Sequence, residues 1–113
     1  MVEKKENLNA IETSIKERFT EEQIAAWKKD FGKIKRLQIG DKVIFVKPAT
    51  SEHVANYTVG CATGGLNAGA RYLLNELFIA GDNEIFDDEE YFKTAMLQCE
   101  NLIDLKKSII TDL

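Results

Sequence analysis

The sequence predicts an α+β fold, a mostly helical single small domain with one antiparallel β-hairpin. Three observations lead to this prediction. Apolar residues recur at helical spacing over residues 70–80 and again over 88–110. The pattern changes over residues 33–47, where β-branched and aromatic residues flank Gly40 and Asp41. The chain has 113 residues, the size of one domain, and its longest apolar runs hold four or five residues, too few to span a membrane.

Residues 1–19 predict an amphipathic N-terminal arm. Leu8, Ile11 and Ile15 fall on one stripe at spacings of three and four, and the opposite side is charged. The stripe is narrow and the first six residues include no long apolar run, so the arm is expected to fray when alone. A single compact α+β domain is expected over residues 20–113.

A short helix is predicted over residues 21–31. Thr20 and Gln23 have the spacing of a capping box, and two glutamates occupy the first turn, where the helix dipole favours negative charge. Gly32 is a suitable left-handed stop. Trp27 is interpreted as a core anchor rather than a ligand platform.

A β-hairpin is predicted over about residues 34–47. Its strands would run over 34–39 and 42–47, and Gly40 suits the first position of a two-residue type II′ turn. Pro48 should end the second strand because it has no N–H to donate. Two strands are marginal in water, so the hairpin must pack on helices or pair with another chain.

Further helices are predicted in the remaining sequence. Thr50 caps a helix over about 51–59, and a helix over 70–80 follows. Residues 60–70, rich in glycine, fit either a flexible connection or a closely packed small-residue helix surface. A long C-terminal helix is expected over about 88–110, opened by an acidic turn. Its apolar stripe holds Phe92, Ala95, Met96, Cys99, Leu102, Ile103 and Ile110.

Charge is unevenly distributed. The net charge is -4, but residues 28–47 carry +5 and residues 82–113 carry -6. Three interpretations of the basic hairpin remain open: a solvated face, docking between subunits, or nucleic-acid binding.

The sequence holds no strong catalytic, metal-binding or nucleotide-binding motif, so no enzyme activity, cofactor or metal is expected. Cys61 and Cys99 are interpreted as reduced, buried thiols, with a redox pair as the alternative. His53 is the only histidine, and no third residue is identified that would orient it as a base for Cys61. The glycines lack the phosphate-loop pattern, and the acidic run at 82–90 lacks the EF-hand pattern.

The N-terminal sequence shows no apolar stretch typical of a signal peptide, so a cytoplasmic location is expected.

The order of elements resembles small tail assembly chaperone-like proteins of tailed phages and prophages. The resemblance covers about residues 25–110. It rests on the hairpin entering residues 43–48 (VIFVKP), the helix start at 49–52 (ATSE), the helix that ends near Gly81 and Asp82, and a terminal amphipathic helix after Asp87 and Asp88.

This resemblance implies a non-enzymatic role in virion assembly, in the cytoplasm of the host cell. Such proteins coat the long helical tape measure protein before the tail tube polymerises around it. A protein client and self-association as a homo-oligomer are therefore expected, without a membrane. The alternative is a small nucleic-acid-associated regulator that uses the basic hairpin. The candidate protein-binding residues are Leu8, Ile11, Ile15, Lys35, Arg36, Lys42, Phe92 and Met96.

Overall fold

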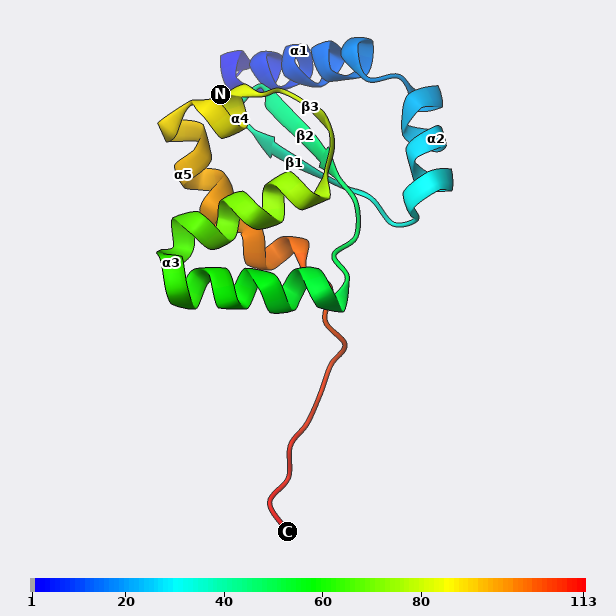
Figure 1. The fold of residues 1–113 in the computed structure, drawn as a ribbon. Helices are drawn as coiled ribbons and strands as arrows, with labels where there is room; N and C mark the ends of the chain where they lie inside the picture. Colours follow the sequence, from blue (N-terminus) through cyan, green and yellow to red (C-terminus); the bar gives the residue numbers. More distant parts are fainter. Residues whose placement is uncertain (1) are drawn as a thin grey trace.

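The computed structural model describes the backbone of residues 2–113 and the side chains of residues 8–113. A three-stranded antiparallel sheet lies between two helical layers (Figure 1). One layer comprises α1 and α2, and the other comprises α3, α4, α5 and the short 3-10 helix η1. The elements are α1 (Val2–Arg18), α2 (Glu21–Phe31), β1 (Lys35–Ile39), β2 (Lys42–Val46), α3 (Ser51–Leu77), β3 (Phe78–Gly81), α4 (Glu84–Asp87), α5 (Glu89–Gln98) and η1 (Cys99–Leu102).

Helix α2 has the bounds that its sequence predicts. The Thr20 hydroxyl accepts a hydrogen bond from the Gln23 N–H at 3.2 Å, and the Gln23 side chain accepts one from the Thr20 N–H at 2.9 Å. At the other end, the Gly32 N–H donates to the Lys28 carbonyl, with Gly32 at a φ of 86°. The capping box and the glycine stop are therefore confirmed.

The hairpin is also confirmed. β1 and β2 pair in antiparallel register from Lys35 opposite Val46 to Ile39 opposite Lys42. Gly40 has a φ of 62°, whereas Asp41, like the other described non-glycine residues, does not have a positive φ. This combination is typical of the expected type II′ turn.

The sheet has a third strand that the sequence analysis did not predict. Residues 70–80 were expected to be helical, but the helix ends at Leu77 and Phe78–Gly81 forms β3. β3 pairs with the free edge of β2, with Ile44 opposite Gly81. The apolar residues of this segment suit either structure, and pairing with β2 satisfies backbone groups that a longer helix would leave unpaired.

α3 is a helical hairpin with a kink at Gly65, whose φ of 86° and ψ of 172° are not helical. The two halves run side by side (Figure 1). They meet at glycines, because a Cβ built on Gly60 would lie 3.2 Å from the Gly69 Cα. Of the two alternatives for residues 60–70, the closely packed small-residue surface is therefore the observed one.

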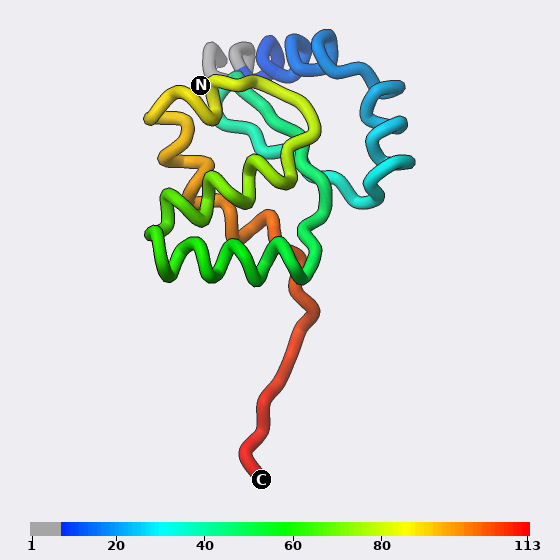
Figure 2. The backbone as a smooth tube through the Cα atoms, in the orientation of Figure 1, coloured from blue at the N-terminus to red at the C-terminus, as the bar shows by residue number. Residues whose placement is uncertain are grey.

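The C-terminal helix is much shorter than the expected 88–110. Asp88 caps α5 by accepting from the Glu90 N–H at 2.9 Å, as the acidic start predicted. However, α5 ends at Gln98, η1 continues to Leu102, and residues 103–113 form an extended tail that leaves the body of the protein (Figure 2). Leu105 and Ile110 are 82% and 95% exposed, so they have no surface on which a further helix would be stabilised.

The two faces of the sheet belong to two apolar cores. Ile44 and Val46 point into the larger core beneath α3 and α5, whereas Val43 and Phe45 point toward α1 and α2. Trp27 packs on Phe45 with ring centroids 5.1 Å apart, which confirms its interpretation as a core anchor.

Gly81 makes the closest approach between β3 and β2, and we predict that Gly81→Ala is severely destabilising. Gly81 has a φ of 144°, and an added Cβ would lie 2.6 Å from the Ile44 Cα and closer still to the Val43 carbonyl oxygen. The free energy of unfolding, measured with urea, should fall by about 3 kcal/mol or more.

Gly32→Ala provides the matched control for this prediction. Its φ is also positive, but an added Cβ would meet no atom within 4 Å. Its cost should be smaller, about 1–2 kcal/mol, because only backbone strain opposes the added Cβ. Equal losses of unfolding free energy in the two variants would show that the close approach at Gly81 does not add to the destabilisation.

Candidate protein-binding groove

The five apolar residues of the predicted binding set lie on both sides of the sheet. Ile15 is buried and Ile11 half-buried against the core beneath α1 and α2, while Leu8 is exposed. Phe92 is buried in the larger core and Met96 packs against it. Ile15 and Phe92 are therefore used by the fold itself and are covered within one copy.

The three basic residues of the set pair with acids of the same chain. Two of these pairs join the hairpin to the C-terminal half, and the third joins it to α1. These pairs are at least partly exposed, so each is expected to stabilise the fold only weakly. The pairs are Lys35 with Asp104 (Nζ–Oδ1, 2.6 Å), Arg36 with Glu12 (3.2 Å) and Lys42 with Glu84 (3.9 Å).

A hollow of about 280 Å³ between α1 and α2 brings two of the predicted residues together, Ile15 and Arg36. Its other lining residues are Glu12, Lys16, Phe19, Glu21 and Ile24. The Arg36–Glu12 ion pair lies within this lining, so charged groups of the chain already satisfy one another there.

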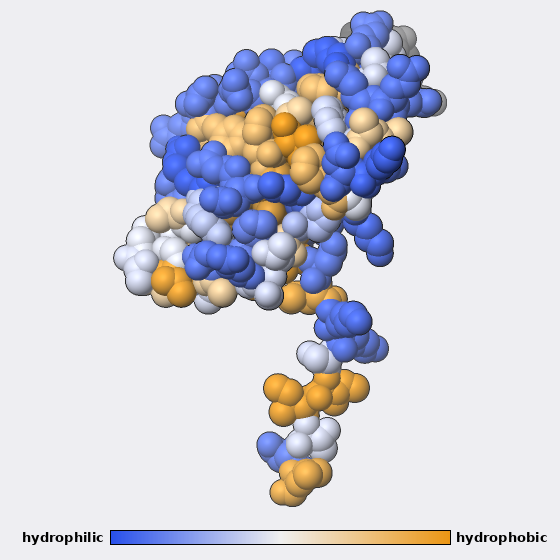
Figure 3. Space-filling view, turned by 45° about the vertical axis from the view of Figure 1, so that its right-hand side comes forward, coloured by the Kyte–Doolittle hydropathy of each residue, from blue (hydrophilic) through white to orange (hydrophobic). Residues whose placement is uncertain are grey.

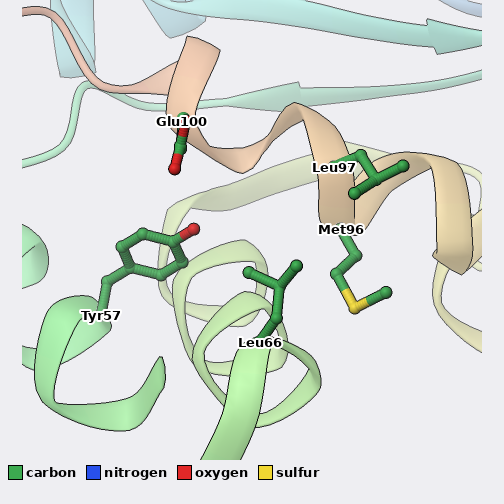
Figure 4. A pocket seen from close by; sticks show the side chains of 5 residues that line it. All are labelled: Tyr57, Leu66, Met96, Leu97 and Glu100. Atoms are coloured by element: carbon green, nitrogen blue, oxygen red, sulfur yellow. The ribbon is translucent and has the colours of Figure 1, made fainter. Parts of the chain in front are cut away.

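A second groove lies between the first half of α3 and the helices α5 and η1. It consists of two adjoining hollows of about 130 Å³ and 410 Å³ that share Tyr57 and Glu100. The smaller hollow is further lined by Leu66, Met96 and Leu97 (Figure 4). The larger is further lined by Val54, Thr58, Asn101, Ile103 and Leu105.

Unpaired apolar side chains mark this groove. α5 directs Phe92 and Ala95 into the core, which leaves Leu97 on its outer side at 66% exposure. Across the groove, Leu66 beside the α3 kink is 41% exposed. Figure 4 shows Tyr57 and Leu66 from α3 opposite Leu97 and Glu100. Glu100 is the one carboxylate among the residues that line either hollow.

Two polar groups near the groove, the Tyr57 phenol and the Cys99 thiol, have raised pKa values. Burial, together with a hydrogen bond with Cys61, raises the pKa of Tyr57 to about 12. Burial likewise raises the pKa of the Cys99 thiol to about 12. At neutral pH neither group offers a charged nucleophile. The groove therefore suits apolar side chains accompanied by one cation near Glu100.

The other residues considered for chemistry have structural partners. His53 completes the cap of α3, because its Nδ1 accepts from the Thr50 N–H at 3.0 Å. Arg71 lies 4.0 Å from the centre of the Phe92 ring and donates to the Phe86 carbonyl. In the part of the chain whose side chains are described, no cluster of three or more His, Cys, Asp or Glu residues could hold a metal ion.

Most of this groove is not predicted from the sequence. Met96 is among the predicted binding residues, whereas Leu66, Leu97 and Glu100 are not. Leu97 carries a usable signal, since it is a leucine that lies beside the predicted stripe of its helix rather than on it. Leu66 carries no such signal in the sequence, because its exposure depends on the kink at Gly65.

Comparison with known proteins gives no match. No protein-family model matches the sequence, and no curated protein or solved structure matches the chain. The structure also bears on membrane insertion: none of the helices in residues 2–113 has the length and apolar character to cross a bilayer.

The raised pKa values predict a loss of stability at alkaline pH. Above pH 9 for Cys99 and pH 10 for Tyr57, the unfolded chain loses protons that the folded chain keeps until about pH 12. The free energy of unfolding should therefore fall over this window, by up to about 1.4 kcal/mol per pH unit for each group. Below pH 9 neither group makes the free energy of unfolding depend on pH.

Urea unfolding between pH 8 and pH 12 measures this effect, using Tyr57→Phe for comparison. The variant keeps the ring but has no phenol to ionise, so its stability should fall less steeply above pH 10. An identical pH dependence in the two proteins would contradict the assignment to Tyr57.

Proposed function

We propose that this protein is a non-catalytic assembly factor that holds an apolar segment of a protein client, in the manner of a phage tail assembly chaperone. The observation that carries the proposal is the groove between α3 and α5–η1, with exposed Leu66 and Leu97 on its two sides. Exposed apolar side chains that gather around a hollow are typical of a binding surface.

The groove has the features that recognise an amphipathic helix. Two helical elements form its walls, its lining is mainly apolar, and Glu100 lies where the two hollows meet. A client helix would place apolar residues at helical spacing into the hollows and a lysine or arginine near Glu100. The tape measure protein, which is long and helical, is a client of this chemistry.

The phage assignment is supported by the order of elements. The resemblance rests on the helix with Trp27, the hairpin that leads to Pro48 and the helix that precedes Gly81 and Asp82; these occur here in that order, with β3 following the last helix. The terminal amphipathic helix is reduced to Glu89–Gln98. A role in the host cytoplasm and self-association belong to the same proposal. The neutral Tyr57 and Cys99 and the capping role of His53 favour binding over catalysis.

Co-expression with the tape measure protein of the same genome tests the proposal. The unmodified chain should co-purify with this client and increase its solubility. Leu97→Asn should weaken binding about tenfold or more, because it removes one apolar contact worth about 1.5–3 kcal/mol.

Val59→Asn is the matched control. Val59 is 59% exposed on α3, but it lines neither hollow. This variant should bind the client as the unmodified chain does. The proposal fails if the unmodified chain and client do not associate, or if the two variants bind the client equally.

A further inference from the structure

The tail that leaves η1 carries a second unpartnered apolar surface. Leu105, Ile109 and Leu113 are exposed and lie four residues apart, and apolar side chains are visible along the tail in Figure 3. Among the described residues, no backbone hydrogen bond involves 104–113. Leu105 lines the larger hollow of its own copy, whereas Ile109 and Leu113 lie exposed and the backbone groups of residues 104–113 have no backbone partner within the copy.

The spacing of these residues favours a helix when a surface is provided. In a helix, positions four apart share one face, which would also continue the line of Leu102. Thr111 would lie on the opposite face. A helix of ten residues is marginal in water without packing, which accounts for the extended tail of a single copy.

The groove provides a surface of matching length and charge. Residues 104–113 would form a helix of about 15 Å, and the stretch of α3 from Val54 to Gly64, which precedes the kink at Gly65, is also about 15 Å long. Lys106 would flank the apolar face of the tail helix. A lysine in this position can pair with Glu100, which lies where the two hollows meet.

Leu105 lines the larger hollow of its own copy, and the tail beyond Leu105 runs away from the groove. Asp104 forms an ion pair with Lys35, whose Nζ also donates to the Asn101 carbonyl at 3.3 Å. These contacts fix the root of the tail against β1, and the chain then runs outward from the body (Figures 1 and 3).

We infer that residues 104–113 of a second copy occupy the groove as an amphipathic helix, so that the protein self-associates by exchange of its tail. This inference rests on the groove being the binding site of the proposed function. It adds a mode of regulation, because the client and the tail of a neighbouring copy compete for one surface. Binding of the client therefore releases the tail.

Sedimentation of the full chain across a wide range of concentrations tests the inference. The unmodified chain should reach at least twice the 12.8 kDa of one copy. Ile109→Asn should remain at the mass of one copy, while Thr111→Asn, altered on the opposite face of the tail helix, should associate as the unmodified chain does. Ile109 is 84% exposed, so its substitution leaves the folded body intact.

A mixing experiment tests whether the contact joins tail to groove. Leu97→Asn alone should also stay at the mass of one copy. A mixture of Ile109→Asn, which has an intact groove, with Leu97→Asn, which has an intact tail, should form a pair. The inference is overturned if the unmodified chain remains a single copy, if Ile109→Asn associates normally, or if the mixture does not pair.

Client binding separates this inference from the proposed function. Ile109→Asn keeps its groove, so it should hold the tape measure protein at least as tightly as the unmodified chain. If Ile109→Asn self-associates normally and still holds the client, the inference about the tail is wrong and the proposed function is not contradicted. If it fails to hold the client while the mixture still pairs, the proposed function alone is wrong.

Discussion

The rest of the structure depends on the burial of β2 on both of its faces. Val43, Ile44, Phe45 and Val46 are each no more than 3% exposed. Such a strand needs an apolar layer on either side and a paired strand along each edge. β1 and β3 provide the edges, α1 and α2 cover Val43 and Phe45, and α3 to η1 cover Ile44 and Val46. Burial of each of these side chains contributes about 1.5–3 kcal/mol.

This arrangement also determines where the groove lies. The Lys47 N–H donates to the Leu77 carbonyl at 2.8 Å, which ties the end of α3 to the end of β2. The second half of α3 buries Leu73, Leu74 and Leu77 against the sheet. The kink at Gly65 folds the first half back beside the second, and Val54, Tyr57 and Thr58 of the first half line the groove with residues of η1. The groove therefore lies at the edge of the larger core.

Local signals allowed much of the fold to be predicted. The capping box at Thr20 and Gln23, the glycine turn at Gly40 and the acidic start at Asp88 each act within a few residues, so their patterns were sufficient. β3 was missed because its conformation depends on an edge of β2 that lies more than thirty residues away. The C-terminal helix was predicted too long because its apolar stripe continues beyond the surface that one copy provides. The groove depends on the α3 kink and on the end of α5 together, so no local pattern identified it.

The tail is the feature in which the sequence and the structure of one copy disagree most. Its sequence has the periodicity of an amphipathic helix, and its structure in one copy is extended. A binding surface outside the copy accounts for both observations, because a short helix becomes stable when its apolar face is packed.

Hydrogen exchange of the amides of residues 104–113, measured as protein concentration is raised, tests this account most directly. If the tail becomes a helix in the groove of a neighbouring copy, protection of these amides should rise with concentration, together with protection around Glu100. Rapid exchange of the tail at every concentration, with the groove unchanged, would contradict it.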